Sequence, residues 1–153
     1  MNKIKVLVVS DNHGDLEGIN YALNKHYDCD YYLHLGDSCV PEIYLKPFIS
    51  ILGNNDYGLN YPEERIVNIA GINFLMRHGS YNPDTLVRWA KTRNCKYILC
   101  GHTHIFTDEI IDGIRILNPG SISYNRDLSS PCYAILTIDE DKNVEFERIN
   151  LDF

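Results

Sequence analysis

Long hydrophobic runs and excess positive charge are both missing from this 153-residue chain. No apolar stretch approaches the ~20 residues that a membrane-spanning helix needs. The stretch nearest the N-terminus, at 6–9, is too short for a signal peptide and meets Asp11 almost at once. We therefore expect no membrane association and a cytoplasmic location. Lys and Arg number 14 against 21 Asp and Glu, so long DNA or RNA, whose phosphates need cations, is not an expected partner.

Paired cysteines are missing as well. The five cysteines are an odd number, and none stands in a Cys-x-x-Cys pair, so we expect buried thiols rather than disulfides or a cysteine-based zinc site. Hydrophobic residues at 44% and charged residues at 23% are ordinary for a globular protein. This length suits a single domain over 1–153. The oligomeric state stays open, a homo-oligomer included.

Strand and helix patterns alternate in the first half of the chain, whereas hairpins dominate the second half. Short β-branched runs predict strands at 3–9, 31–35, 48–52 and 97–100. Apolar spacing predicts a helix that Asp15 would cap, a short helical region at 41–46 and a helix at 84–93. Hairpins are predicted within 64–76, 108–117 and 133–149. This order indicates a mixed α/β domain with two packed sheets and helices outside.

Metal-capable side chains follow these predicted strands, at the points where the strands end: Asp11, His13, Asp37, Asn54, His78, His102 and His104. The carboxyl ends of strands in open α/β sheets converge on one crevice, so we expect these side chains to meet there. Imidazoles with carboxylate and amide oxygens suit divalent cations. Two such ions, ~3.5–4 Å apart, can clamp a phosphoryl group and activate water. Their charge would draw an anionic substrate into an otherwise acidic protein.

Other residues near these positions have competing interpretations. His34 is interpreted as a packing residue rather than a ligand, and Asp56 as either a turn residue or a partner that orients a ligand. Arg77 and Arg126 are interpreted as solvated surface rather than phosphate contacts. Three tyrosines near the site are candidates for stacking on a base, with core packing as the alternative: Tyr57, Tyr61 and Tyr81.

Five short motifs stand in a fixed order: Asp11-Asn12-His13, Gly36-Asp37, Gly53-Asn54-Asn55-Asp56, His78-Gly79 and Gly101-His102-Thr103-His104. Together they resemble the calcineurin-like metallophosphoesterase superfamily, in particular its small, single-domain bacterial and archaeal phosphodiesterase branch. The segment Asn118-Pro119-Gly120-Ser121 also matches that branch, so the resemblance covers most of the chain. It implies a four-layer α/β/β/α sandwich of two mixed sheets flanked by helices.

The resemblance also implies two divalent metal ions, with manganese favoured and nickel, zinc, iron or cobalt as alternatives. The first ion would take Asp11, His13, Asp37 and His104. The second would take Asp37, Asn54, His78 and His102, with Asp37 bridging. A metal-bridging hydroxide would then attack phosphorus. The implied substrate is a small phosphodiester or nucleotide-like molecule, with Asn54 and Asn55 in contact with it and His78 and Asn55 as catalytic residues.

Asn55 is the one departure from the family pattern. Many members have His at this position, where it serves as the general acid for the leaving group. A carboxamide can donate a hydrogen bond but cannot deliver a proton near neutral pH, and general acid catalysis is typically worth ~10²–10⁴-fold. We therefore expect a preference for good leaving groups, or another proton donor.

Several alternative functions stay open. One is a catalytically weak scaffold acting through protein partners, as in a eukaryotic retromer subunit that resembles this fold. Others are a phosphomonoesterase, a cyclic-nucleotide phosphodiesterase and a nucleotide pyrophosphohydrolase. Protein Ser/Thr phosphatases of the superfamily carry a longer Gly-Asp-x-x-Asp-Arg-Gly motif, whereas Gly36-Asp37 continues here as Ser38-Cys39-Val40-Pro41, which excludes that class.

Overall fold

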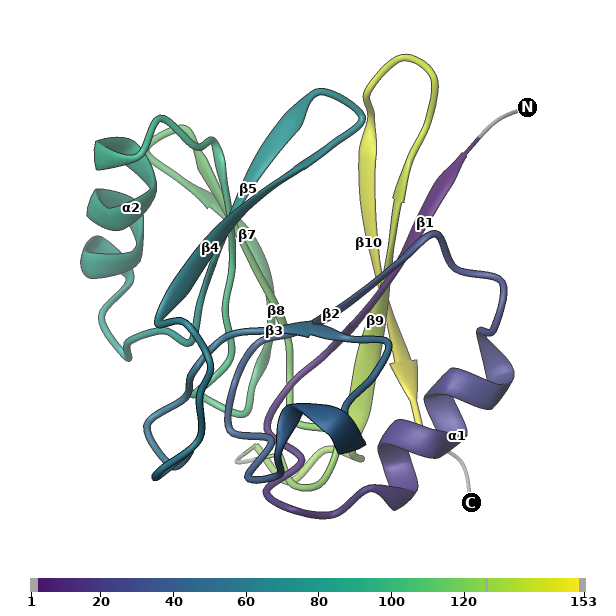
Figure 1. The fold of residues 1–153 in the computed structure, drawn as a ribbon. Helices are drawn as coiled ribbons and strands as arrows, with labels where there is room; N and C mark the ends of the chain where they lie inside the picture. Colours follow the sequence, from purple (N-terminus) through teal and green to yellow (C-terminus); the bar gives the residue numbers. More distant parts are fainter. Residues whose placement is uncertain (1–2, 126, 152–153) are drawn as a thin grey trace.

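Two sheets face one another in the computed structural model, which describes residues 3–125 and 127–151, and a helix covers the outer face of each sheet (Figure 1). The elements in chain order are β1 (Ile4–Val9), α1 (Glu17–Lys25), β2 (Tyr31–His34), the short 3-10 helix η1 (Glu42–Tyr44), β3 (Ile49–Ser50), β4 (Glu64–Ile69), β5 (Ile72–Arg77), α2 (Pro83–Thr92), β6 (Tyr97–Leu99), β7 (Phe106–Ile111), β8 (Ile114–Pro119), β9 (Cys132–Ile138) and β10 (Val144–Asn150).

Both sheets are mixed. The first has the order β10-β9-β1-β2-β3, with β1, β2 and β3 parallel and the β9–β10 hairpin antiparallel beside β1. The second has the order β4-β5-β6-β8-β7, with β5, β6 and β8 parallel and an antiparallel strand at each edge. The predicted four-layer α/β/β/α sandwich is therefore confirmed. In the described part of the chain, neither helix is long and apolar enough to cross a bilayer.

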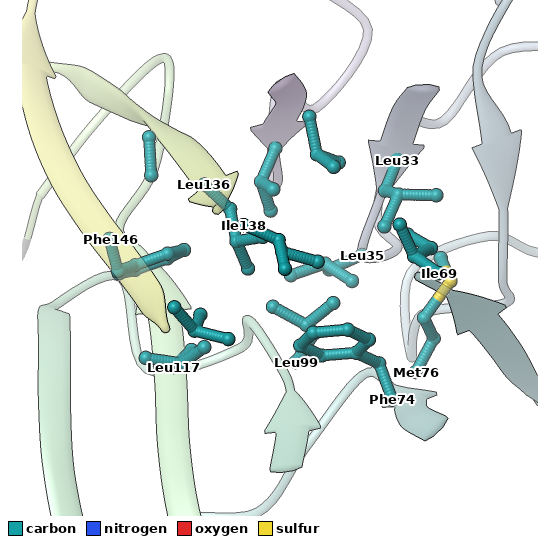
Figure 2. Packing of buried hydrophobic residues seen from close by; sticks show 14 of the residues in the cluster. Leu33, Leu35, Ile69, Phe74, Met76, Leu99, Leu117, Leu136, Ile138 and Phe146 are labelled. Atoms are coloured by element: carbon teal, nitrogen blue, oxygen red, sulfur yellow. The ribbon is translucent and has the colours of Figure 1, made fainter. Parts of the chain in front are cut away.

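Alternation along β1 divides the core between the layers. Val6 and Val8 point toward the second sheet, whereas Leu7 and Val9 point toward α1, as the two-residue period of a strand requires. Figure 2 shows the central cluster, in which Phe74 and other side chains of the second sheet meet Leu33 and others from the first. Smaller apolar clusters hold α1 and α2 against the outer faces of the sheets. These three layers of apolar packing fix the relative positions of the loops at the strand ends.

Element boundaries differ from the prediction mainly at the sheet edges. β3 has only two residues, Ile49–Ser50, against the expected 48–52, because it pairs with β2 alone at the edge of its sheet. The carboxylate of Asp15 accepts the Glu17 N–H at 3.0 Å, which is a capping contact, although the residue preceding α1 is Leu16. The five cysteines are free thiols, three of them buried.

Replacement of Phe74 by Ala tests the inter-sheet core. The ring is fully buried and its centroid lies 4.9 Å from that of Tyr97. We expect Phe74→Ala to lower the free energy of unfolding by about 3–5 kcal/mol, because it leaves a cavity between two sheets that cannot both move inward. Urea denaturation measures this loss. Ile66→Ala, at a β4 side chain that is 49% exposed, is the control and should cost less than about 1 kcal/mol. Equal losses at the two positions would contradict this account of the core.

Candidate metal centre

Loops from both sheets join at the carboxyl ends of their parallel strands. The N–H groups of Asp11 and His13 donate to the carbonyls of Gly36 and Asp37 at 3.1 and 3.0 Å, which links the loops after β1 and β2. On the second sheet, the Gly101 N–H donates to the His78 carbonyl at 2.7 Å, which links the loops after β5 and β6. These backbone bonds join loops within each sheet, and the His102 N–H joins the two sheets by donating to Oδ2 of Asp11 at 3.1 Å, so the expected convergence of strand ends is present.

Asp11, His13 and His104 form one group of potential ligands whose donor atoms lie within 4.8 Å of one another. Oδ1 of Asp11 lies 3.2 Å from Nε2 of His104 and 3.7 Å from Nε2 of His13. The two Nε2 atoms are 3.2 Å apart. Asp11 and His104 are buried, whereas His13 is exposed, so this group opens to solvent on the side of His13.

Asp11, Asp37 and His78 form a second such group, and all three are buried. Nε2 of His78 lies 3.2 Å from Oδ2 of Asp37 and 3.7 Å from Oδ1 of Asp11. Oδ2 of Asp37 also lies 3.8 Å from Nε2 of His13. The Asp37 carboxylate therefore lies between the two groups, within reach of one imidazole from each.

Asn54 and His102 extend the second group toward solvent. Nδ1 of His102 lies 3.2 Å from Oδ1 of Asn54, and its ring centroid lies 5.2 Å from that of His78. Asn54 is exposed and His102 is half-buried. All seven residues expected at the site thus lie in one continuous patch that runs from buried carboxylates to an exposed amide.

Two imidazoles are held in one orientation by backbone carbonyls. Nδ1 of His78 contacts the Leu35 carbonyl at 2.7 Å, and Nδ1 of His104 contacts the Tyr124 carbonyl at 2.8 Å. A carbonyl oxygen only accepts, so each Nδ1 donates and each Nε2 is directed at the carboxylates. Metal-binding histidines are commonly fixed in this way by a partner on the other ring nitrogen.

Two buried atoms in the described part of the chain lack any hydrogen-bond partner, and both lie here: Oδ1 of Asp11 and Nε2 of His78. An unpaired buried carboxylate oxygen is costly, and such an atom calls for an explanation. A divalent cation would satisfy both atoms, since oxygen and imidazole nitrogen are suitable ligands for it. The residues present therefore fit the metal ions that the sequence implied.

The pKa values of the two carboxyl groups in the cluster are lowered by the neighbouring imidazoles. Burial opposes ionisation of Asp11, yet His104 and His13 beside it hold the pKa of that carboxyl well below its usual range. The pKa of Asp37 is likewise lowered, since its contact with His78 outweighs its burial. Burial opposes protonation of His78, but Asp37 and Asp11 raise its pKa. Both carboxylates thus stay ionised and attract cations.

Five of the seven candidate ligands adopt left-handed backbone conformations: Asp11, His13, Asp37, His102 and His104, with φ between 47° and 72°. Such conformations are uncommon outside glycine and cost of order 1–3 kcal/mol each. They are tolerated where the surrounding structure enforces them, and they concentrate at functional sites. These conformations turn the side chains of three short loops, after β1, β2 and β6, toward the same point.

Two glycines allow the loops to approach closely. A Cβ on Gly36, whose φ is +101°, would lie 2.6 Å from Nδ1 of His78, and one on Gly53 would overlap the Asp37 carboxylate. Neither space admits a larger side chain without displacing a candidate ligand. Gly36 is therefore required by contact and by its positive φ, and Gly53 is required by contact.

The residues around the centre form a supporting network. Asp56 accepts the N–H groups of Asp37 and Gly53 at 2.9 and 2.7 Å, so the interpretation of Asp56 as a residue that orients a ligand agrees with the structure. His34 is buried, and its Nε2 bonds to Oδ1 of Asn12 at 2.8 Å, in agreement with a packing role. The Asn12 amide donates to the Ser38 carbonyl at 3.1 Å and so joins the loops after β1 and β2.

Sequence reasoning missed the role of Asn12, which lies between two candidate ligands. It also missed Ser121 and Ser123, whose hydroxyls donate to the Asp11 carbonyl at 2.9 and 2.8 Å. Only the match of Asn118-Pro119-Gly120-Ser121 pointed to this segment.

Other expected neighbours lie elsewhere or in other roles. Tyr61 is buried and donates to the Val40 carbonyl at 2.7 Å, so its candidacy for base stacking is wrong. Arg77, expected as solvated surface, is instead half-buried and ion-paired with Glu63 and Glu64, and it lines a hollow of about 240 Å³ beside Asn54. Arg126 lies outside the described residues.

Asn55 contacts the Asp37 carboxylate at both oxygens. Its backbone N–H donates to Oδ1 at 2.8 Å and its side-chain amide donates to Oδ2 at 3.0 Å. The residue that replaces the expected general acid is therefore adjacent to the centre, and its amide is bonded to a candidate ligand.

This sandwich, with Asp and His side chains gathered at one end around unpartnered buried atoms, defines the class of the metallophosphoesterases. The chain belongs to the calcineurin-like phosphoesterase superfamily, whose domain matches residues 4–141. It is 30% identical over 146 residues to the probable metallophosphoesterase YsnB of Bacillus subtilis, covering 90% of this chain and 86% of that protein. Membership of this family implies divalent metal ions, in agreement with the two Asp/His groups.

Solved structures share the fold over nearly the whole chain. A predicted phosphoesterase from Streptococcus pneumoniae has a TM-score of 0.83 and 25% identity, covering 99% of both chains. Two more distant structures show the same fold. Vacuolar Protein Sorting 29 from Cryptosporidium parvum has a TM-score of 0.75 at 19% identity, covering 97% of this chain and 99% of that one. An archaeal phosphodiesterase has a TM-score of 0.73 at 23% identity, covering 97% and 100%.

Because a Cβ at Gly36 would meet His78, we expect substitution of Gly36 to destabilise the protein by more than backbone strain alone would. Gly36→Ala would place its Cβ against His78 and disturb the bond from Nδ1 to the Leu35 carbonyl. Gly71→Ala is the matched control, because Gly71 also has positive φ, +84°, but no atom within 4 Å of the added Cβ. We expect Gly71→Ala to lose about 1–2 kcal/mol of stability from strain. Gly36→Ala should lose at least about 2 kcal/mol more, because the disturbed bond is buried.

Urea denaturation of the two variants beside the parent protein measures the difference. A loss at Gly36 no greater than at Gly71 would show that the His78 loop moves aside easily, against the rigid placement described above.

Proposed function

We propose that this protein is a phosphodiesterase that uses two divalent metal ions held by the seven converging residues. The observation that supports this most directly is the pair of buried atoms without hydrogen-bond partners, Oδ1 of Asp11 and Nε2 of His78, which lie 3.7 Å apart. In a site built only for stability, such atoms would form hydrogen bonds or would not be buried.

We assign Asp11, His13, Asp37 and His104 to the first ion and Asp37, Asn54, His78 and His102 to the second. Asp37 is the proposed bridge because Oδ2 lies 3.8 Å from Nε2 of His13 and 3.2 Å from Nε2 of His78. Asp11, which belongs to both groups, would reach a cation through Oδ1, since its Oδ2 already accepts the Ser10 hydroxyl at 2.5 Å and the His102 N–H at 3.1 Å. That leaves one Asp11 oxygen for a cation.

The chemistry of the bound ions would be Lewis-acid stabilisation of charge on phosphorus oxygens and activation of a water for attack. The residues of the chain would hold the ions and the substrate in position. Asp11 and Asp37 hold charge in a buried position, and carbonyls keep His78 and His104 turned inward. Asn54, exposed beside His102, is positioned to contact the substrate as it enters. The proposed catalytic contribution of His78 is its imidazole, which lies between the carboxylates of Asp11 and Asp37 and would bind the second ion.

A diester substrate is favoured by the open geometry of the site. His13 and Asn54 are exposed, and a hollow of about 240 Å³ borders Asn54 and His78, so the site is open to solvent and leaves space for an organic group beside a phosphate. Two divalent ions against the charges of Asp11 and Asp37 leave the centre positive, which suits an anionic ester. The archaeal neighbour of the same fold is itself a phosphodiesterase.

We propose that manganese is the native metal, with nickel, zinc, iron or cobalt as alternatives, and that the protein acts in the cytoplasm as one domain over 1–153. A mixed oxygen and imidazole ligand set without thiolate supports a metal of intermediate hardness. Five free thiols suit a reducing compartment.

A scaffold role through protein partners is the second candidate. Asn55, in place of the usual acid, is the observation that favours it. Against it, all seven ligand positions keep metal-capable side chains, and these side chains converge.

Metal restoration tests the proposed function. After removal of metals with a chelator, we expect no hydrolysis of a chromogenic phosphodiester. Mn²⁺ or Ni²⁺ should restore it more effectively than Mg²⁺, because imidazoles bind the former more strongly. The corresponding monoester should be hydrolysed at least about tenfold more slowly under the same conditions, since it lacks the second ester group and the contacts that this group would make with the site.

Two variants sharpen this experiment. Asp37→Asn should lower diester turnover by at least about 100-fold through loss of the bridging charge. His26→Ala is the control histidine: it bonds to the Tyr133 hydroxyl at 2.8 Å, away from the centre, and should retain activity. Hydrolysis of the monoester alone would show a phosphomonoesterase. No hydrolysis with any metal, despite stoichiometric binding, would favour the scaffold.

Asn55 provides a separate test of the leaving-group preference. We expect Asn55→His to raise turnover of diesters with poor leaving groups by about 10²-fold, since an imidazole can protonate the departing oxygen. Diesters with good leaving groups, such as p-nitrophenolate, should change little. Turnover of both series is measured against leaving-group pKa, and a slope identical to that of the parent protein would refute the expectation.

A further inference from the structure

Two exposed tyrosine rings flank the candidate metal centre. The ring centroid of Tyr81 lies 4.5 Å from that of His102, and that of Tyr124 lies 6.2 Å from that of His104. Tyr81 is 60% exposed and Tyr124 is 58% exposed. Each of the two His residues in the loop after β6 therefore has an aromatic surface beside it that is open to solvent.

The Tyr81 ring is the better placed of the two for recognition. Its neighbour His102 lies 3.2 Å from the Asn54 amide and beside the His78 ring, on the side of the hollow lined by both residues. Tyr124 instead supports His104, because its backbone carbonyl contacts Nδ1 of that residue. A substrate whose phosphate lies at the metals would thus have the Tyr81 ring near it on the side of His102.

The backbone around Tyr81 is held in place. The Asn82 N–H donates to the Ser80 hydroxyl at 3.1 Å, and the Asn82 side chain caps α2 by accepting the Asp84 N–H at 3.0 Å. Pro83 at the first turn of α2 restricts the chain further. A ring on such a segment is preorganised, so contact with a ligand costs little conformational freedom.

We propose that Tyr81 is a substrate-binding residue that stacks on a planar base, so that the site selects nucleotide phosphodiesters. This inference rests on the proposed function, because the phosphate must lie at the metals for the base to reach the ring. Neutral aromatic surface beside a cationic centre matches a nucleotide, which has a flat base and an anionic phosphate close together. The formal charge of −7 keeps longer nucleic acids away, so the substrate is a mononucleotide ester or a short oligonucleotide.

The test compares two ligands that differ only in the base. Adenosine 5′-monophosphate and ribose 5-phosphate are titrated calorimetrically into the protein loaded with Mn²⁺. Stacking of a base on an aromatic ring should make the nucleotide bind at least about tenfold more tightly than the sugar phosphate. Tyr81→Ala should abolish this difference while leaving ribose 5-phosphate affinity within about twofold, whereas Tyr81→Phe should preserve it because the ring is retained. Tyr27→Ala, at an 82% exposed tyrosine of the α1–β2 loop, is the control.

The result that overturns the inference is equal affinity of the parent protein for the two ligands. An equal loss for both ligands in Tyr81→Ala would also overturn it, since it would mean that Tyr81 supports His102 rather than contacting a base. A different result would contradict the proposed function. If no diester is hydrolysed but the base-dependent affinity depends on Tyr81, the nucleotide subsite stands and the phosphodiesterase assignment does not.

Discussion

Two carboxylates buried at one end of the sandwich set the constraint on which the rest of the structure depends. Asp11 and Asp37 are 0% and 1% exposed, and like charges in a poorly solvated interior need compensating positive charge. The fold surrounds them with imidazoles from both sheets, and two buried atoms still lack partners. This incomplete compensation distinguishes the cluster from an ordinary buried ion-pair network, in which the charged groups satisfy one another.

The cost of that arrangement falls on the loop backbone. Asp11, His13, Asp37, His102 and His104 all have positive φ, an uncommon state for side chains of this size. The strain is sustained because the strands that precede these loops belong to a tightly packed core, and because Asp56 and Asn12 tie the loops together. The buried apolar layers therefore stabilise the fold and also hold the ligands in conformations that short loops would not adopt alone.

The sequence predicted the architecture and the members of the site because both depend on patterns along the chain. Alternation revealed the strands, and polar residues at strand ends indicated the candidate ligands that the structure brings together. Positions that depend on contacts between distant segments could not be predicted in this way. Asn12 links the loops after β1 and β2 through Ser38, 26 residues away in the sequence. Tyr61 and Tyr81 looked equivalent in the sequence, yet one is buried against Val40 and the other faces the centre. Residue type alone does not encode that difference.

Burial and charge change together across the centre, and this gradient determines how a substrate would enter. The carboxylates lie deepest, the imidazoles of His78 and His104 lie beside them, and the neutral groups of Asn54 and Tyr81 lie at the rim. An anion is attracted inward by metal charge that is poorly screened at depth, while the organic part of the molecule meets uncharged polar and aromatic surface. A phosphate ester would therefore bind with its phosphorus inward and its ester groups outward, which is the orientation that hydrolysis of a diester requires. Inorganic phosphate would gain only the inner part of these contacts, so the same gradient that would orient a substrate would also let the rim residues select which ester is bound.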